Sequence, residues 1–187
     1  MKSGWATQLS SIKNERIYNM PHEEQNDALK QNNKIAIERY KFAIKCLGNE
    51  KKVVADVACG MGYGSHLLRQ AGHDVIGIDK SDEAIDYARV NYPGNYFVWD
   101  IEMKCSFNVD VIVCLETLCH IQDPQKFIDE LEVKELIVSA PINPNPNDGY
   151  KYRLHNLSEA QFRDILKEWE ILSEFRQKKY LTLYCKK

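Results

Sequence analysis

Three closely spaced glycines form the feature of this sequence that is best suited to binding a ligand. Gly60, Gly62 and Gly64 follow the short apolar run VVADVA at residues 53–58. Glycine permits positive φ and lets a ligand approach the backbone, and a helix that starts after such a turn offers its N-terminal amides. Taken alone, the glycines are equally compatible with a tight strand-to-helix turn that binds nothing.

Two aspartates extend this pattern. Asp79 ends the next apolar run, DVIGID, seventeen residues after Gly62, and Asp100 ends the run YFVWD. An acid at the end of the second strand can accept hydrogen bonds from both hydroxyls of a ribose, although an aspartate there can equally cap the next helix. Ligands of open α/β sheets bind at the carboxyl ends of the strands. Because the glycines and both aspartates follow three successive strands, they predict one ligand site along that edge.

An alternation of apolar strands and helices has to position these residues. We expect strands at 53–58, 74–79, 96–100, 109–115 and 134–140. The apolar periodicity predicts helices at 34–47, 65–72, 83–92, 124–132 and 158–169, the last with Ser158 as its N-cap. Nearly continuous apolar strands separated by helices indicate a parallel sheet that is covered on both faces. The final segment, 170–187, is typical of an antiparallel hairpin that turns at QKK.

Two segments fall outside this alternation. Residues 1–33 are polar and have no sustained period, so we expect an N-terminal arm before a domain that spans residues 34–187. With Trp5, Tyr18 and Met20, this arm can fold over the ligand site as a lid, and a frayed terminus is the alternative. Residues 142–157 are rich in proline, asparagine and glycine, and this loop is long enough to suggest a function.

The composition excludes several classes of protein. The 187 residues are 44% hydrophobic and 28% charged, which is typical of one compact domain and not of a disordered tail, a collagen or a disulfide-rich scaffold. The net charge of −2 gives no basic excess for duplex DNA. No run approaches the ~18 apolar residues of a membrane span, so we expect a soluble, cytoplasmic protein. Six scattered cysteines without a CxxC pair predict reduced thiols and no metal site.

The sequence resembles the class I S-adenosylmethionine-dependent methyltransferases, in particular their small-molecule methyltransferase-like domains. The resemblance covers roughly residues 34–186 and is carried by VVADVACGMGYGSHLL, VIGIDKSDEAIDYA, YFVWDIE, VDVIVCLETLCHIQDPQKF and LIVSAP. It implies an α/β, Rossmann-like fold: a seven-stranded, mostly parallel sheet with helices on both faces and a C-terminal antiparallel hairpin. It also implies S-adenosylmethionine (SAM) as cofactor and S-adenosylhomocysteine (SAH) as product.

The resemblance assigns the methionine end of the cofactor to the glycine turn. Asp56 and the backbone of Ala58, Gly60 and Gly62 would hold that end. Many members of the family have glycine where this chain has Ala58, although alanine is also common there. A second departure is the stretch ELEVKELIV, which lacks the lysine-proline-glycine-glycine turn that usually precedes the fifth strand.

The adenosine end is assigned to the next two strand ends. The resemblance implies that Asp79 binds the ribose hydroxyls, while Lys80 and Ser81 border the adenine pocket. It further implies that the side chain of Asp100 and the amide of Ile101 read the adenine.

Residues near the sulfonium have more than one interpretation. The resemblance places Leu115 and Glu116 beside the sulfonium, where Glu116 can neutralise charge, bind the acceptor or bond a backbone amide. Arg39 and Tyr40 resemble residues of a helix that closes over the cofactor in similar proteins. An exposed arginine and a buried tyrosine explain these two residues equally well.

Two histidines are candidates for a general base. A sulfonium already activates its methyl group, so the protein mainly aligns the acceptor and excludes water, but an oxygen acceptor usually needs a base. His120 follows the fourth strand, and the alternative for it is to cap or pack against the helix that starts near Pro124. His155, in the loop after the fifth strand, resembles a histidine that is often found there in the family. Either residue can be the base, and neither is required to be.

We expect methyl transfer to an oxygen or nitrogen of a small molecule, for example a sugar or a nucleotide-linked metabolite. A nicotinamide oxidoreductase is disfavoured because the turn reads GMGYG instead of G-x-G-x-x-G. The motif of amino-group DNA methyltransferases is missing after the fourth strand, where this chain has LETLCH. A protein or RNA methyltransferase and a non-catalytic SAM-binding subunit are the alternatives. The sequence leaves the oligomeric state open.

Overall fold

The computed structural model describes residues 22–103, 108–144 and 152–187, and for residues 22–33 it describes only the helical backbone. The chain divides into two units, residues 1–38 and 39–187, which we describe separately. Helix α2 (His22–Leu47) runs through the boundary between them and starts well before the expected residue 34. Trp5, Tyr18 and Met20 lie outside the described residues, so the lid stays a prediction.

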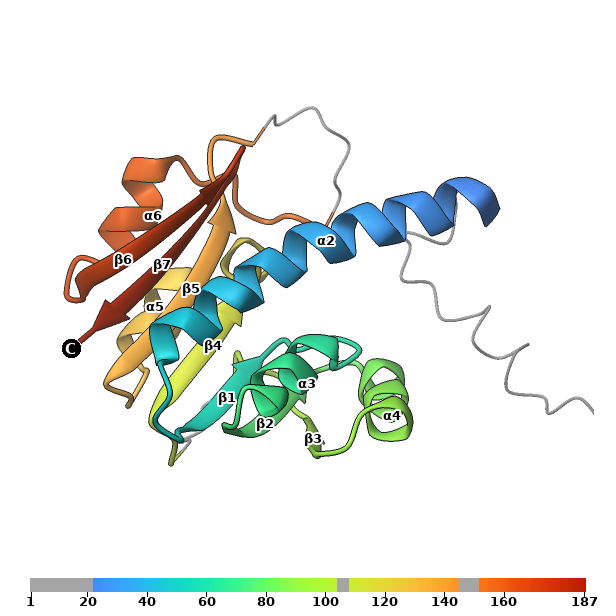
Figure 1. Cartoon of the computed structure of the whole chain (residues 1–187). Helices are drawn as coiled ribbons and strands as arrows, with labels where there is room; N and C mark the ends of the chain where they lie inside the picture. The colour runs from blue at the N-terminus through green and yellow to red at the C-terminus, as the bar shows by residue number, and fades with distance from the viewer. Residues whose placement is uncertain (1–21, 104–107, 145–151) are drawn as a thin grey trace, which may run out of the picture. The chain divides into compact units, whose positions relative to one another are not determined.

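The second unit contains a seven-stranded sheet in the order β3-β2-β1-β4-β5-β7-β6 (Figure 1). The first five strands pair in parallel, whereas β7 pairs antiparallel with β5 and β6. This arrangement confirms the expected fold class, including the C-terminal hairpin. The strands are β1 (Val53–Val57), β2 (Asp74–Asp79), β3 (Asn95–Val98), β4 (Val111–Leu115), β5 (Glu135–Pro141), β6 (Glu170–Gln177) and β7 (Tyr180–Lys186).

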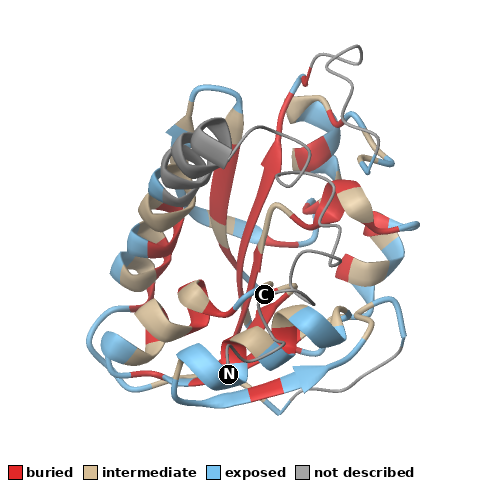
Figure 2. Ribbon diagram, turned by 90° about the vertical axis from the view of Figure 1, so that its right-hand side faces the viewer, coloured by how far each residue is buried: buried red, intermediate tan, exposed pale blue. Residues whose placement is uncertain are grey.

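Helices cover both faces of the sheet, and the period of two along each strand decides which side chain meets which layer. On β1, Val54 packs with α2 and α3, whereas Ala55 and Val57 belong to the core on the opposite face, with α5 and α6. Figure 2 shows the central strands buried and the outer surfaces of the helices exposed. The helices that follow α2 are α3 (Tyr63–Gln70), α4 (Asp82–Asn91), α5 (Pro124–Asp129) and α6 (Glu159–Ile165).

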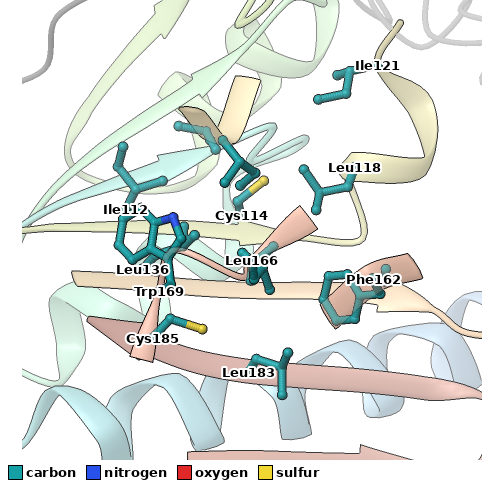
Figure 3. Packing of buried hydrophobic residues seen from close by; sticks show 14 of the residues in the cluster. Ile112, Cys114, Leu118, Ile121, Leu136, Phe162, Leu166, Trp169, Leu183 and Cys185 are labelled. Atoms are coloured by element: carbon teal, nitrogen blue, oxygen red, sulfur yellow. The ribbon is translucent and has the colours of Figure 1, made fainter. Parts of the chain in front are cut away.

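The core on the face of the sheet that α5 and α6 cover also anchors the turn after β4. Leu118, the first residue of the short 3₁₀ helix η2 (Leu118–His120), and Ile121, which follows the helix, are 0% and 4% exposed. Figure 3 shows both side chains among those of the core, together with Phe162 and Leu166 of α6 and its following turn. The main chain on both sides of His120 is therefore fixed by apolar burial.

Several elements differ in length from expectation. Strand β3 ends at Val98, so Trp99 and Asp100 lie in the turn after it, where the Asp100 carboxylate accepts a hydrogen bond from the Glu102 amide at 3.0 Å. Helices α5 and α6 end earlier than predicted, at Asp129 and Ile165. Ser158 caps α6 as predicted. In the described ranges, no helix is both long enough and apolar enough to cross a membrane.

Candidate active site

The glycine turn joins β1 to α3 through a left-handed backbone. Ala58, Gly60 and Gly62 have φ values of 55°, 54° and 81°. Gly62 precedes the first residue of α3, and a Cβ there would lie 2.6 Å from the Cβ of Ala88 and 2.8 Å from a ring carbon of Tyr96. Both the positive φ and the lack of space therefore require glycine at this position. Ala58 adopts the same region as a non-glycine residue, which stores strain at the site.

Asp56 is fully buried beneath this turn, on the face of β1 that meets α2 and α3. Its carboxylate accepts hydrogen bonds from the Tyr40 hydroxyl at 3.0 Å and from the Ser65 hydroxyl at 2.6 Å. Burial raises the pKa of Asp56 to about 6, against the lowering effect of the two hydroxyls and of the Arg69 charge. A cation bound close to Asp56 would therefore favour the charged form of this carboxyl group.

Asp79 connects the glycine turn to the end of β2. One carboxylate oxygen accepts a hydrogen bond from the Gly60 amide at 2.8 Å, and the other accepts one from the Ser81 amide at 3.0 Å. Ser81, and not Asp79, caps α4, because its hydroxyl accepts the Ala84 amide. Each carboxylate oxygen has capacity for a further donor, so the group can still bind two hydroxyls.

The remaining residues predicted for the adenosine end lie next to Asp79. The Trp99 amide donates to the main-chain oxygen of Asp79 at 2.9 Å, which brings Asp100 to the neighbouring strand end. Lys80 is exposed, and Ile101 is partly buried against the large core. The structure thus brings the glycine turn, Asp79 and Asp100 to one edge of the sheet, as the sequence predicts.

Glu116 directly follows Leu115, the partly buried last residue of β4, and has a positive φ of 59°. Its amide donates to the Ser139 hydroxyl oxygen at 2.9 Å, and the Ser139 hydroxyl donates to the Glu116 carboxylate at 2.8 Å. The Arg39 guanidinium lies 3.7 Å from the same carboxylate oxygen. Ser139 and Arg39 therefore fix a negative charge at the carboxyl end of β4.

Arg39 is buried, in contrast to the exposed arginine that was one interpretation of the sequence. Its side chain lies over the Tyr180 ring, 4.9 Å from the centroid. Burial raises the pKa of Tyr63 to about 12, and the charge of Arg39 opposes this shift. Among the described residues, none accepts a hydrogen bond from its Nε or Nη1. Buried donors without acceptors are costly, and they suit a carboxylate ligand.

The two candidate bases are joined through the main chain. The His120 Nδ1 lies 2.8 Å from the carbonyl oxygen of Tyr152, and the His155 Nε2 lies 2.9 Å from that of Ile121. The amide of Leu154 donates to the carbonyl of Cys119 at 2.8 Å. The segments 118–122 and 152–155 therefore lie side by side. His120 does not cap α5, because the Asp123 side chain does so.

Some residues that contribute to the candidate site could not be recognised from the sequence. Ser65 donates a hydrogen bond to Asp56, Ser139 donates one to Glu116, and the Tyr180 ring lies beneath Arg39. A single serine or tyrosine within a helix or strand does not predict such a contact. Four of the five cysteines in the described ranges are buried. Burial raises the pKa of the Cys59 thiol, which keeps it protonated as the packing interpretation requires. Within those ranges, no group of three side chains is arranged to hold a metal.

Part of this chain is similar in sequence to known methyltransferases. Residues 55–132 match the family model described as a methyltransferase domain. A ubiquinone biosynthesis O-methyltransferase of Coxiella burnetii is 36% identical over 97 residues, which are 48% of this chain and 42% of that protein. A protein of the same description from Hydrogenovibrio crunogenus is 29% identical over 104 residues, covering 48% of this chain and 41% of the relative. This chain thus spans less than half the length of these relatives.

Solved structures share the fold. The magnesium protoporphyrin IX methyltransferase of Synechocystis PCC 6803, crystallised with SAH, superposes with a TM-score of 0.71 at 18% identity, over 90% of this chain and 89% of that one. The PH0226 protein of Pyrococcus horikoshii superposes with a TM-score of 0.67 at 21% identity, over 84% of this chain and 92% of that one.

The family match and the fold confirm the resemblance seen in the sequence. Residues 55–132 match a methyltransferase domain, and the chain has the fold of a methyltransferase that was crystallised with SAH. The matched residues 55–132 contain the glycine turn, Asp79, Asp100, Glu116 and His120.

Proposed function

We propose that this protein binds SAM at the carboxyl edge of β1, β2 and β4 and transfers its methyl group to an oxygen of a small-molecule acceptor. The observation that carries the proposal is the joining of the glycine turn to Asp79 by the 2.8 Å hydrogen bond from the Gly60 amide, inside the matched methyltransferase domain. This contact sets amides and a carboxylate side by side, which suits an amino-acid-nucleoside ligand.

The residues present fit SAM at three points. Asp79 retains acceptor capacity for two ribose hydroxyls. Arg39 has buried donors that would pair with the methionine carboxylate, and Asp56 lies beneath the turn where it would favour the ammonium group. Lys80, Ser81, Asp100 and Ile101 would border the adenine, and Leu115 the sulfonium. When bound, SAM supplies an activated methyl group.

The chain's own groups then have distinct tasks. Glu116, held by Ser139 and Arg39, places a negative charge beside the proposed sulfonium position. His120 would take the proton of the acceptor hydroxyl at Nε2, because its Nδ1 already donates to the Tyr152 carbonyl. Both residues sit on a turn that is anchored in the core, which limits their movement during the reaction.

The names of the relatives support an oxygen acceptor on a small molecule. Two of the similar proteins are described as ubiquinone biosynthesis O-methyltransferases, but they match only about half of this chain. The net charge of −2 supports a small molecule over duplex DNA. The free thiols of Cys46, Cys59, Cys114 and Cys185 support the reducing cytoplasm as the proposed location.

Two measurements test the proposal. Calorimetric titration should show binding of SAM and SAH but not of NAD, and Asp79→Ala should weaken it. The protein should then convert methyl-labelled SAM to SAH with acceptors from a panel of phenols, sugars and amines. Labelling of protein or RNA alone would transfer the assignment to a macromolecular methyltransferase. Binding without transfer to any acceptor class would instead favour a non-catalytic SAM-binding subunit.

A further inference from the structure

We propose that Tyr96 is a positioning residue: its hydroxyl holds the Gly62 carbonyl and thereby keeps the glycine turn in the conformation that would bind the methionine end of SAM. The inference rests on the proposed function for the ligand of this turn. Tyr96 belongs to β3, and β2 lies between β3 and β1 in the sheet. Its side chain therefore has to cross β2 to reach the turn that follows β1.

Two glycines make room for the Tyr96 ring. Gly77 of β2 pairs with Tyr96, and a Cβ at Gly77 would lie 2.5 Å from the ring carbon Cδ1. The ring therefore lies across β2, which a larger residue at position 77 would obstruct. On the side of the turn, a Cβ at Gly62 would lie 2.8 Å from the ring carbon Cε1. Tyr96 is only 3% exposed, so the surrounding main chain encloses this ring.

The hydrogen bonds at the Tyr96 hydroxyl have a fixed direction. Nη1 of Arg69 donates to the hydroxyl oxygen at 2.7 Å, and a guanidinium cannot accept a hydrogen bond in return. The hydroxyl proton is therefore donated to the Gly62 carbonyl, 3.2 Å away. A charged donor on the oxygen polarises the hydroxyl and strengthens this second bond. Burial raises the pKa of Tyr96, so the hydroxyl keeps its proton at neutral pH.

Arg69 is itself fixed by neighbouring main chain. Its Nη2 donates to the Val75 carbonyl at 2.9 Å, and its guanidinium lies over the Tyr96 ring, 4.6 Å from the centroid. The guanidinium also fills the space beside Gly94, where a Cβ would lie 2.1 Å from Cζ of Arg69. Contacts with α3, β2 and the start of β3 therefore determine where the Tyr96 hydroxyl lies.

Holding the Gly62 carbonyl fixes the peptide group that begins α3. This carbonyl accepts the His66 amide at 3.0 Å as well as the Tyr96 hydroxyl, so each of its two lone pairs has a donor. The peptide group is planar and trans, so the Tyr63 N–H points away from the held carbonyl and out of the N-terminal end of α3. Amides at a helix N-terminus bind anions such as a carboxylate. The Tyr96 bond therefore orients an amide for the proposed ligand.

Tyr96→Phe tests the inference, because it removes one oxygen atom and keeps the ring between the two glycines. SAH affinity of the full chain, measured by calorimetry, should fall roughly fivefold to tenfold, about the contribution of one hydrogen bond. In the ligand-free protein, hydrogen exchange of the Gly60 and Gly62 amides should become faster by about the same factor, because the turn opens more often.

Tyr184→Phe is the matched control. The Tyr184 hydroxyl donates to the Glu135 carboxylate at 3.0 Å, at the first residue of β5 and so at the opposite end of the strands from the glycine turn. This variant also loses one tyrosine hydrogen bond. Whatever its melting temperature, it should bind SAH like the unaltered protein and leave the exchange of the Gly60 and Gly62 amides unchanged.

Three results would overturn the inference: unchanged amide exchange in Tyr96→Phe, unchanged SAH affinity in Tyr96→Phe, or an equal loss of affinity in Tyr184→Phe. The last result would trace the loss to general stability. Failure of the proposed function is seen separately. If the unaltered protein binds neither SAM nor SAH, the proposed function is refuted, and amide exchange in the ligand-free variants still decides whether Tyr96 holds the turn.

Discussion

The proposed cofactor half and the proposed acceptor half of the candidate site are built in different ways. The cofactor half uses main-chain amides and carboxylates at the ends of β1, β2 and β3, and its contacts join neighbouring strand ends, such as Gly60 with Asp79. The acceptor half uses side chains on two segments, 118–122 and 152–155, that are more than thirty residues apart in the chain. The first half depends on the sheet, whereas the second depends on one loop docking against one turn.

This difference separates binding from turnover. A ligand held by strand ends is positioned by the most stable part of the fold, so single substitutions there should change affinity and leave the rest intact. A base held by a docked loop should be sensitive to changes that leave cofactor binding unaffected. Variants in the two halves should therefore affect different measured quantities.

The largest effect is expected in the acceptor half. His120→Ala should lower turnover by about 10²- to 10⁴-fold, the usual contribution of a general base, because no proton acceptor remains at Nε2. SAH affinity from calorimetry should not change, since no cofactor contact is lost. Equal losses of turnover and SAH affinity would mean that the two halves are not separate.

The next largest effect belongs to the cofactor half. Asp79→Ala should weaken SAM binding by roughly 100-fold, since it removes a charged acceptor of two ribose hydroxyls and leaves the Gly60 amide without its partner. Calorimetry should show this loss, while Asp86→Ala, an exposed acid on α4, should bind normally. Unchanged affinity in Asp79→Ala would place the ribose elsewhere.

Asp56 should make the stability of the fold depend on pH. Its folded-state pKa of about 6 lies above the ordinary value of 3.8, so between these values the native state holds a proton that the unfolded chain has released. This stabilisation is present below pH 3.8 and is lost as the pH rises through about 6. Urea unfolding should show a difference of order 2 kcal/mol in this dependence between the unaltered protein and Asp56→Asn.

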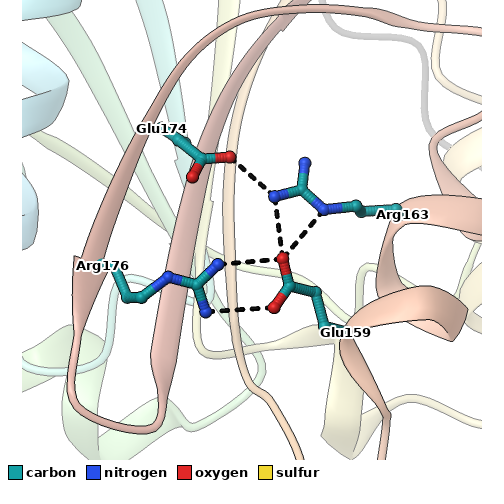
Figure 4. A network of polar contacts seen from close by, with 4 residues as sticks. All are labelled: Glu159, Arg163, Glu174 and Arg176. Atoms are coloured by element: carbon teal, nitrogen blue, oxygen red, sulfur yellow. Dashed lines mark hydrogen bonds and ion pairs between the residues drawn. The ribbon is translucent and has the colours of Figure 1, made fainter.

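The smallest effect is expected at an exposed ion-pair network that supports the start of α6. Glu159 accepts hydrogen bonds from Arg163 and Arg176, and Arg163 also binds Glu174 (Figure 4). The two arginines lower the pKa of Glu159 to about 2, so its contribution is present above the ordinary value of 4.5 and is lost as the pH falls toward 2.

Glu159→Gln should therefore lower the melting temperature slightly at neutral pH and low salt. The difference should vanish at about 1 M salt, where charges are screened over a few ångströms. Asp164→Asn, on the same helix, is the matched control. A salt-independent loss would mean that Glu159 acts by packing and not by charge.

Much of this architecture follows from the sequence. The apolar runs predicted β1, β4 and β5, because these central strands are almost entirely buried and need no polar residues on either face. The glycine turn was predictable because left-handed backbone and close approach both select glycine, as at Gly62. Asp79 was predictable as the last residue of β2, and Asp100 as a residue near the end of β3, although it lies in the turn after that strand.

Only the tertiary structure decided how the side chains of different elements meet. The sequence allows an exposed Arg39, but α2 buries it over Tyr180 and beside Glu116, two residues from distant strands. It also leaves the contacts of His120 and His155 open, and the docking of 152–155 on 118–122 places each ring beside a main-chain carbonyl. Local patterns determine secondary structure and strand ends because those depend on neighbours in the chain. Burial of a charge and docking of a loop on a turn depend on partners that only folding brings together.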